Sequence, residues 1–164
     1  MKRGFTLTEF VIAAAILGIM AAAAAPVYQS YVLSAKESAA KDNLRVLRNV
    51  IEIYAIQHNG IPPGYVENDL LSGVSSQEFE SQLTHSEVIL QDGSADEIRR
   101  TGLVMIPENP FNGRRETLVI SEEKPFPAEP VEPDFFGWIY KPATKNIRVN
   151  WPGAGKDGVR YFDY

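Results

Sequence analysis

The sequence predicts an α+β protein in which a long N-terminal helix packs against a small antiparallel sheet. The helix is indicated by residues 10–28, which are nearly all apolar and form a stretch long enough to cross a bilayer. The sheet is indicated by residues 103–151, where short aliphatic or aromatic runs alternate with proline, glycine and asparagine. One long helix followed by several short strands is a pattern of the α+β class.

Composition limits the size and the class of the protein. The chain has 164 residues, with 16 lysines and arginines, 21 aspartates and glutamates, and no cysteine. This length allows one modest folded head beyond the N-terminal segment. The mildly acidic balance includes no basic cluster that could follow a phosphate backbone, so nucleic acid is not an expected partner. Without cysteine, the chain excludes disulfides, thiolate catalysis and zinc-thiolate sites.

Helical spacing continues after Pro26 as far as about His58. In this second half one broad side is charged or polar and the other is apolar; the apolar side comprises Leu44, Leu47, Val50, Ile51, Ile53, Tyr54 and Ala55. The sequence NGIPP at residues 59–63 predicts the end of the helix, because glycine adopts the left-handed conformation of a C-terminal cap and proline prevents continuation. The sequence therefore predicts one helix from Phe5 to about His58.

The head is expected to contain two short helices and four strands. Capping-box patterns predict helices that begin near residues 75 and 94. The expected strands comprise residues 103–106, 117–120, 136–140 and 147–151, with a tight hairpin over residues 141–146. Trp138 and Tyr140 lie on one face of their strand and are expected to pack on the apolar side of the long helix. The proline-rich acidic segment 125–133 is expected to be an extended, exposed loop without a packed core.

No residue pattern in the head indicates catalysis. His58 and His85 have no histidine, cysteine or paired carboxylate nearby at metal-ligand spacing. The serines near Gly73 lack the sequence of a nucleophile elbow. The glycine-rich stretch 153–158 contains a lysine but lacks the strand and helix context of a phosphate loop. The sequence therefore predicts a protein that is not an enzyme and needs no cofactor.

A carboxylate at the beginning of the apolar segment requires an explanation. Glu9 directly precedes the uncharged run, where a charge in hydrocarbon costs about 3 kcal/mol. One interpretation is a secretory signal peptide cut after residues 23–25, which match the small-x-small pattern but would leave Pro26 first in the mature chain. A second is a simple one-span anchor, which would leave Glu9 without a partner. Neither interpretation gives the carboxylate a role.

A third interpretation comes from the sequence of residues 2–9. A short basic leader that ends in Gly4, followed by Phe5-Thr6-Leu7-Thr8-Glu9 and a long apolar run, resembles the class III signal of type IV pilins and type II secretion pseudopilins. The resemblance implies that a prepilin peptidase cuts after Gly4 and N-methylates Phe5, the new first residue. Thr8 departs from the pattern, because many members of the family carry an aliphatic residue there.

The resemblance also implies a division of the chain and a set of assembly residues. It implies a leader peptide over residues 1–4, a membrane or filament-core helix over 5–28, the amphipathic half of that helix over 29–59, and a globular head over 60–164. The family's glutamate, helix glycine and helix proline correspond to Glu9, Gly18 and Pro26. Since methylation keeps the positive charge of the Phe5 amine, Glu9 can pair with the amine of a neighbouring subunit.

The expected function is that of a structural subunit of a type IV filament. The absence of cysteine favours a type II secretion pseudopilin, because many type IV pilins carry a C-terminal disulfide loop; a pilus pilin is the alternative, and a membrane-tethered or secreted binding protein is the alternative of another class. The resemblance implies as partners other copies of this chain, other pilins or pseudopilins, the prepilin peptidase, an inner-membrane assembly platform and the lipid bilayer. Major pseudopilins as a family bind calcium in their C-terminal loops, which makes Asp157 and Asp163 conceivable ligands.

Lys2 and Arg3 determine the expected topology. Positive residues before a membrane span favour a cytoplasmic N-terminus. The chain is therefore expected to cross the inner membrane once with its head in the periplasm, and then to enter a periplasmic or cell-surface filament.

Overall fold

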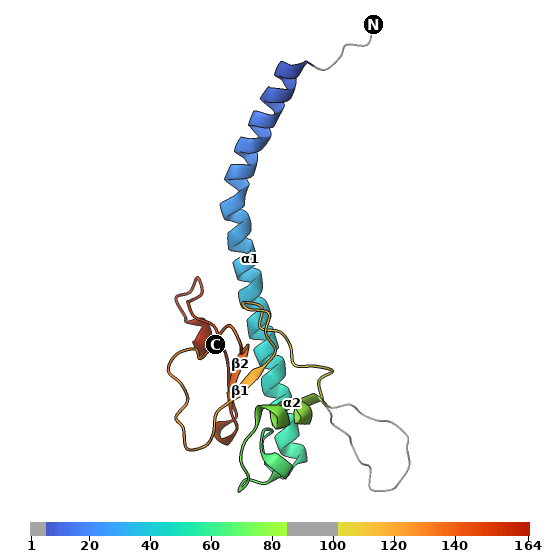
Figure 1. Cartoon of the computed structure of the whole chain (residues 1–164), viewed down its shortest axis with the longest axis vertical. Coiled ribbons are helices and arrows are strands. Elements are labelled where there is room, and N and C mark those ends of the chain that lie inside the picture. Colours follow the sequence, from blue (N-terminus) through green and yellow to red (C-terminus); the bar gives the residue numbers. More distant parts are fainter. Residues whose placement is uncertain (1–5, 85–101) are drawn as a thin grey trace, which may run out of the picture. The chain divides into compact units, whose positions relative to one another are not determined.

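The computed structural model describes residues 6–84 and 102–164. The chain divides into two compact units, Met1–Lys36 and Glu37–Tyr164. The first unit contains the beginning of helix α1, and the second contains the rest of α1, helix α2 and the strands (Figure 1). The expected second short helix near residue 94 lies outside the described residues.

Helix α1 (Leu7–Gln57) corresponds closely to the helix expected from Phe5 to about His58, which is thereby confirmed. The helix ends as the sequence indicates, because Asn59 and Gly60 adopt positive φ angles of 55° and 89°. The N–H of Gly60 donates to the carbonyl oxygen of Ala55 at 2.7 Å and so satisfies one of the last helical carbonyls.

The second half of α1 is amphipathic. Its buried residues share one side of the helix and comprise Ala40, Leu44, Leu47, Ile51, Tyr54 and Ala55. Burying a side chain such as Leu47 stabilises the fold by about 1.5–3 kcal/mol, so this side is the main attachment of the head to the helix. The prediction was wrong for Ile53, which is 41% exposed because, at 100° per residue, it lies almost opposite the buried side.

Helix α2 (Ser76–Thr84) confirms the first of the two short helices. Ser75 precedes it, and the Ser75 carbonyl oxygen accepts a hydrogen bond from the N–H of Phe79 at 3.1 Å. Phe79 and Leu83, four residues apart and therefore on the same face of the helix, are both buried. The described residues also form short 3₁₀ helices: η1 (Val66–Asn68) lies between α1 and α2, η2 (Pro142–Thr144) between β2 and β3, and η3 (Tyr161–Asp163) after β3.

The sheet has three strands in the order β1, β2, β3. Strands β2 (Trp138–Lys141) and β3 (Asn146–Val149) form the expected antiparallel hairpin, with Trp138 opposite Val149 and Tyr140 opposite Ile147. Strand β1 (Thr117–Val119) runs parallel to β2, with Thr117 opposite Trp138. The expectation of a purely antiparallel sheet was therefore wrong. A parallel pair needs a long crossover connection, and residues 120–137 supply one.

Residues 103–106 do not form the strand that their composition predicts. The N–H of Leu103 instead donates to the carbonyl oxygen of Leu83 at the end of α2, at 2.8 Å. The neighbouring edge of β1 is also occupied, because the N–H of Val119 donates to Ser76 Oγ at 3.2 Å. An aliphatic run cannot extend the sheet where a helix already takes the edge donor.

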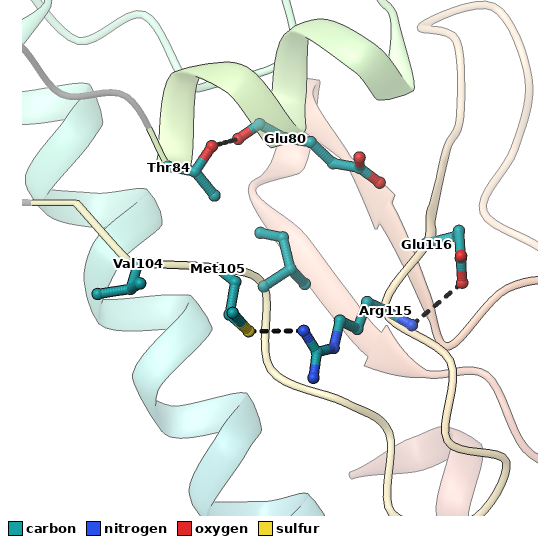
Figure 2. A pocket seen from close by; sticks show the side chains of 7 residues that line it. Glu80, Thr84, Val104, Met105, Arg115 and Glu116 are labelled. Atoms are coloured by element: carbon teal, nitrogen blue, oxygen red, sulfur yellow. Dashed lines mark hydrogen bonds between the residues drawn. The ribbon is translucent and has the colours of Figure 1, made fainter.

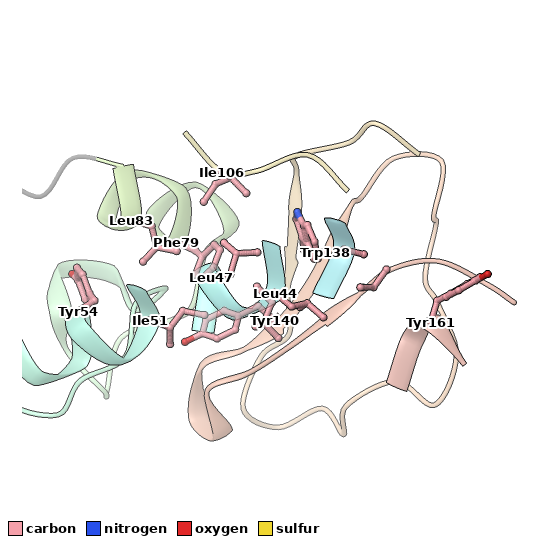
Figure 3. Packing of buried hydrophobic residues seen from close by; sticks show 13 residues of the cluster. Leu44, Leu47, Ile51, Tyr54, Phe79, Leu83, Ile106, Trp138, Tyr140 and Tyr161 are labelled. Atoms are coloured by element: carbon pink, nitrogen blue, oxygen red, sulfur yellow. The ribbon is translucent and has the colours of Figure 1, made fainter. Parts of the chain in front are cut away.

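Apolar residues cover both faces of the sheet. On one face, Trp138 and Tyr140 of β2 pack with Leu44, Leu47 and Ile51 of α1, as the sequence predicts (Figure 3). Phe79 of α2 joins the same cluster, with its ring centroid 4.5 Å from that of Tyr140. This cluster forms the main core of the head.

A second, smaller cluster lies on the opposite face of the sheet. Ile120, Ile139 and Phe162 are buried there, and Phe126 and Val131 pack against them. Phe126 and Val131 belong to residues 121–135, here called the strap. The expectation of an exposed loop was therefore wrong for these two residues. Although the segment is rich in proline and acidic residues, both apolar side chains pack against the second cluster.

Asn150 holds the strap by hydrogen bonds and is fully buried. Its Oδ1 accepts from the N–H of Val131 at 2.9 Å, and its Nδ2 donates to the carbonyl oxygens of Val131 at 2.7 Å and Phe136 at 2.8 Å. A buried side-chain amide with every bond satisfied stabilises one arrangement of the chain and penalises the others.

We expect Asn150→Ala to lower the free energy of unfolding by about 2–4 kcal/mol, because three hydrogen bonds are lost and buried backbone groups remain unpaired. Thermal unfolding followed by circular dichroism on the full chain in detergent measures the effect. Asn49→Ala, at an exposed asparagine of α1, is the matched control and should change stability little. An equal effect of the two substitutions would contradict the role of Asn150.

Candidate functional site

The first turn of α1 contains the carboxylate that the sequence analysis singled out. Glu9 Oε2 accepts from the N–H of Thr6 at 2.9 Å and from Thr6 Oγ1 at 2.7 Å. In return, the N–H of Glu9 donates to Thr6 Oγ1 at 3.3 Å. This reciprocal arrangement is a capping box, which satisfies otherwise unpaired donors at the start of a helix.

Thr6 is therefore a capping residue that was not identified from the sequence. It gives Glu9 local hydrogen-bond partners within the subunit. The signal was available in the spacing Thr6-Leu7-Thr8-Glu9, which matches the capping-box pattern. Hydrogen bonds to a threonine do not neutralise a carboxylate, however, so the charge of Glu9 still lacks a cation among the described residues of α1.

Beyond this cap the helix is exposed and apolar. Each residue from Thr6 to Gln29 is exposed, including large apolar side chains such as Phe10 and Leu17. An 18-residue stretch within Leu7–Gln57 is strongly apolar, and none of that stretch is buried. By length and composition this helix can cross a membrane, and an apolar surface of this kind marks a site of contact with lipid or with other proteins.

Gly18 and Pro26 lie inside the exposed half of α1. A side chain added at Gly18 would meet no atom within 4 Å, so the subunit itself does not require glycine there. Pro26 lies in the helix interior, where proline removes one backbone hydrogen bond. The helix nevertheless continues through both positions, in agreement with the single helix expected from Phe5 to about His58.

Gly4 and Phe5, the expected processing residues, lie outside the described residues. The alternative cleavage position, residues 23–25, lies within α1.

The expected calcium ligands bind different cationic side chains. Asp157 lies 3.8 Å from Lys41 Nζ, and its Oδ1 accepts from the N–H of Val159 at 3.1 Å. Asp163 is bound by Arg160 at 2.6 Å and by Arg148 at 3.2 Å. Hydrogen bonds from Arg160 hold the pKa of Asp163 below its usual value.

No metal cluster is formed by these residues. In the described part of the chain, no group of three or more histidines, aspartates and glutamates could hold a metal ion. Calcium binding in the C-terminal loops stays a prediction of the resemblance. His58 stacks on Tyr54, with ring centroids 3.9 Å apart, and its Nδ1 lies 2.8 Å from the Tyr54 carbonyl oxygen. This contact gives His58 a structural role at the end of α1.

A cleft of about 350 Å³ lies between α2, residues 104–106 and the segment before β1 (Figure 2). Its lining comprises Glu80, Thr84, Val104, Met105, Ile106, Arg115 and Glu116. Burial raises the pKa of Glu80; the Thr117 backbone N–H, which bonds to the Glu80 carboxylate, opposes the shift, and the nearby charge of Glu116 adds to it. This cleft could not be predicted from the sequence, because its walls come from segments far apart in the chain.

The fold and the N-terminal site define a class of protein: a small α+β head on a long helix whose exposed apolar half begins with a capped glutamate. Residues 1–25 match the family described as the Prokaryotic N-terminal methylation motif. Over 76 residues, the chain is 37% identical to a Type IV major pilin protein, PilE1, of Neisseria gonorrhoeae, which covers 46% of this chain and 44% of that protein.

A second relative is a fimbrial protein of Neisseria meningitidis serogroup A, 36% identical over 76 residues, or 46% of this chain and 42% of that protein. The chain thus spans less than half the length of these curated relatives. No solved structure shows significant similarity to the chain. The methylation motif and the pilin relatives support the assignment of the chain to the type IV pilin and pseudopilin family, and the α+β fold with its long N-terminal helix fits that family.

Proposed function

We propose that the protein is a structural, non-enzymatic subunit of a type IV filament that assembles through the exposed half of α1. The observation that carries this proposal is Glu9, a charged residue at the first turn of α1, directly before the uncharged and exposed residues 10–29. A helix that served only as an anchor would gain stability in lipid by losing this charge. The position of Glu9 five residues after Gly4 agrees with the methylation motif that matches residues 1–25.

Assembly gives the charge of Glu9 a partner. Cleavage after Gly4 creates an ammonium group on Phe5, and methylation preserves its charge. In a bundle of such helices, Glu9 of one subunit pairs with the Phe5 amine of the next. Because each subunit supplies both groups to different neighbours, the contact is heterologous and produces an open helical filament.

The route to the filament follows from the charges that flank the helix. Lys2 and Arg3 keep the N-terminus in the cytoplasm, where the prepilin peptidase acts, and the head lies on the opposite side of the inner membrane. An assembly platform in that membrane then transfers the processed subunit from the bilayer to the filament, together with other pilins or pseudopilins.

Within this family, our finer proposal is a pseudopilin of a type II secretion system, because the chain has no cysteine and so cannot form a C-terminal disulfide loop. A pilus pilin is the second candidate, and the similarity to the gonococcal and meningococcal proteins favours it. Deleting the gene in the source bacterium distinguishes the two. Loss of protein secretion with intact pili supports the pseudopilin, and loss of pili with intact secretion supports the pilin.

The processing step provides the direct test of the proposal. N-terminal mass spectrometry of the mature chain should show N-methylated Phe5 as the first residue. Gly4→Leu should leave the uncut precursor in the membrane, because the peptidase is expected to need a small residue at the cleavage site. A mature chain that begins at Pro26, or that retains Met1 in a host with an active prepilin peptidase, would show that the protein is not a subunit of this kind.

A further inference from the structure

The exposed half of α1 has polar side chains at both of its ends. Glu9 lies in the first turn, and residues 10–27, which follow it, carry no nitrogen or oxygen in any side chain. The next residue is Tyr28, and Tyr31 lies about one turn further along. Tyr28 is 70% exposed and Tyr31 is 71% exposed. An apolar stretch of helix is thus bounded by a carboxylate at one end and by a pair of phenols at the other.

The length of this stretch matches the thickness of a bilayer. The rise from residue 9 to residue 28 is about 28 Å along an α-helix. The hydrocarbon core of a typical bilayer is about 30 Å thick. One depth of the helix therefore places both polar ends at a membrane surface, and a shift of one turn, about 5.4 Å, would draw one of them into hydrocarbon.

The two tyrosines have no partner of their own in the subunit. They lie on the same face of α1, because residues three apart on a helix are neighbours. Within the part of the chain that the structure describes, neither phenol has a hydrogen-bond or ring partner. In water the rings would leave apolar area exposed, and in hydrocarbon the hydroxyls would remain unpaired. The boundary between lipid and water satisfies the ring and the hydroxyl together, which is why tyrosine is enriched there.

The other polar side chains near the tyrosines do not require a particular depth. Ser30 Oγ donates to the Val27 carbonyl oxygen at 2.9 Å, and Ser34 Oγ donates to the Ser30 carbonyl oxygen at 3.1 Å. Both hydroxyl protons are used within the helix, so neither serine needs water to satisfy its donor. The first charged side chain after the pair is Lys36, whose long stem can bring its ammonium group to the phosphates of lipid headgroups. The phenols are therefore the groups that are sensitive to the depth of the helix.

We propose that Tyr28 and Tyr31 lie in the phospholipid headgroup region at the periplasmic surface of the inner membrane and set the depth of α1 in the bilayer. With the tyrosines at this surface, residues 10–27 fill the hydrocarbon, and Glu9 lies at the opposite, cytoplasmic surface. The partner of the tyrosine pair is the lipid interface.

This position reduces the cost of keeping a carboxylate on a membrane helix. A charge is most costly at the centre of a bilayer and less costly near its surface, where the side chain reaches water. The bilayer can then hold the subunit before assembly without penalising the residue that assembly needs. The inference rests on the proposed function, because it applies to a subunit that waits in the membrane before it enters the filament.

The absence of cysteine from the chain allows both boundaries to be mapped with single cysteines. Full-length subunits with Leu7→Cys, Ala13→Cys, Ala23→Cys or Ala35→Cys are expressed in cells without the assembly platform, so that they stay in the bilayer. A membrane-impermeant maleimide is then applied from each side. Leu7→Cys should react from the cytoplasmic side and Ala35→Cys from the periplasmic side.

The two inner positions should be protected. Maleimide reacts with the thiolate, which does not form in hydrocarbon, so Ala13→Cys and Ala23→Cys should react about tenfold more slowly or less. After denaturation all four variants should react at similar rates, which is the control for the reagent. Rapid labelling of Ala23→Cys, or protection of Leu7→Cys from the cytoplasmic side, would overturn the inference.

Paired substitutions test whether the tyrosines set the outer boundary. Tyr28→Leu with Tyr31→Leu removes both hydroxyls and extends the apolar character of the helix, so the helix should sink and labelling of Ala35→Cys should fall about fivefold. Tyr28→Trp with Tyr31→Trp is the matched control, because tryptophan also prefers the interface, and it should leave the labelling unchanged. An unchanged rate in the leucine pair, or an equal fall in the tryptophan pair, would contradict the role of the tyrosines.

The same variants separate lipid from protein as the partner. If the tyrosines instead contact a neighbouring subunit, the leucine pair would assemble poorly while the labelling of Ala35→Cys in the membrane stays unchanged, and the inference is wrong. If the wild-type chain does not enter the membrane fraction, the proposed function itself fails.

Discussion

Gly137→Ala is expected to lower the free energy of unfolding of the head by about 4 kcal/mol or more, because the structure has no space for a side chain at this position. An added Cβ would overlap the carbonyl oxygen of Arg114 and lie 2.8 Å from its carbonyl carbon and 3.2 Å from Asn109 Cβ. A domain of this size has a total stability of about 5–15 kcal/mol. One methyl group therefore removes a large share of it.

The backbone on both sides of Gly137 is too constrained to move away. Its N–H donates to the Glu116 carbonyl oxygen at 2.9 Å, beside strand β1. Its carbonyl oxygen accepts from the N–H of Asn150 at 2.9 Å and from Asn109 Nδ2 at 2.8 Å. A shift large enough to accommodate the methyl group would break at least one of these bonds, at a cost of about 1 kcal/mol each or more if a buried group is left unpaired.

Thermal unfolding of the full chain in detergent, followed by far-UV circular dichroism and by the fluorescence of the buried Trp138, measures this effect. Gly73→Ala is the matched control, because a Cβ at Gly73 meets no atom within 4 Å and the backbone there has no positive φ. We expect Gly73→Ala to change stability by less than about 1 kcal/mol. If the two variants unfolded at the same temperature, the close approach of Gly137 to Arg114 would not be a feature of the protein.

The sequence was most informative about features that depend on neighbouring residues. Helix α1, its end at Asn59 and Gly60, and the start of α2 were all predicted because apolar spacing and caps are local. The placement of Trp138 and Tyr140 in the core followed from the alternation of side chains along one strand. These are features in which local preference and the final fold agree.

Features that depend on distant segments were not predicted. The direction of β1 relative to β2 depends on the path of residues 120–137, which composition does not specify. Asn150 belongs to the expected strand 147–151 and nothing in the sequence marks Asn109 as buried, yet both are fully buried and bind backbone groups far along the chain. Buried side-chain amides of this kind are recognised only once their partners are known.

The candidate site likewise combines features that were predicted from neighbouring residues with features that depend on distant segments. Glu9 was identified from sequence because a charge beside an apolar run is unusual, and the spacing of its capping box with Thr6 was also present in the sequence. The cleft beside α2 was not identified, because it exists only after α2 and the segment before β1 meet.

Glu9 has two roles to distinguish: it caps the start of α1 with Thr6, and its charge is proposed to pair with the Phe5 amine of a neighbouring subunit. Glu9→Leu removes both the capping box and the charge, whereas Glu9→Gln removes only the charge, because glutamine also serves in a capping box. Thr6→Ala removes the cap and retains the charge, at a cost of about 1 kcal/mol to the helix start. These three substitutions form a complete comparison at one helix end.

If pairing with the Phe5 amine of a neighbour drives assembly, charge is the decisive property. Leaving one partner of a desolvated ion pair alone costs about 3–5 kcal/mol, which corresponds to a reduction in assembly of about 10²–10⁴-fold. Glu9→Gln and Glu9→Leu should therefore insert in the membrane and lose their leader normally, yet both should form almost no filaments. Thr6→Ala should assemble with a much smaller loss, because its carboxylate remains available to the neighbouring amine.

Counting sheared filaments by electron microscopy, with membrane-inserted subunit measured by immunoblot, provides the comparison. Normal assembly by Glu9→Gln would contradict the ion pair and leave the capping box as the role of this residue. Equal losses in Thr6→Ala and Glu9→Gln would also contradict the ion pair as the decisive contact, because Thr6→Ala retains the charge that Glu9→Gln removes. Only a loss that follows the charge, and not the cap, supports Glu9 as the residue that joins one subunit to the next.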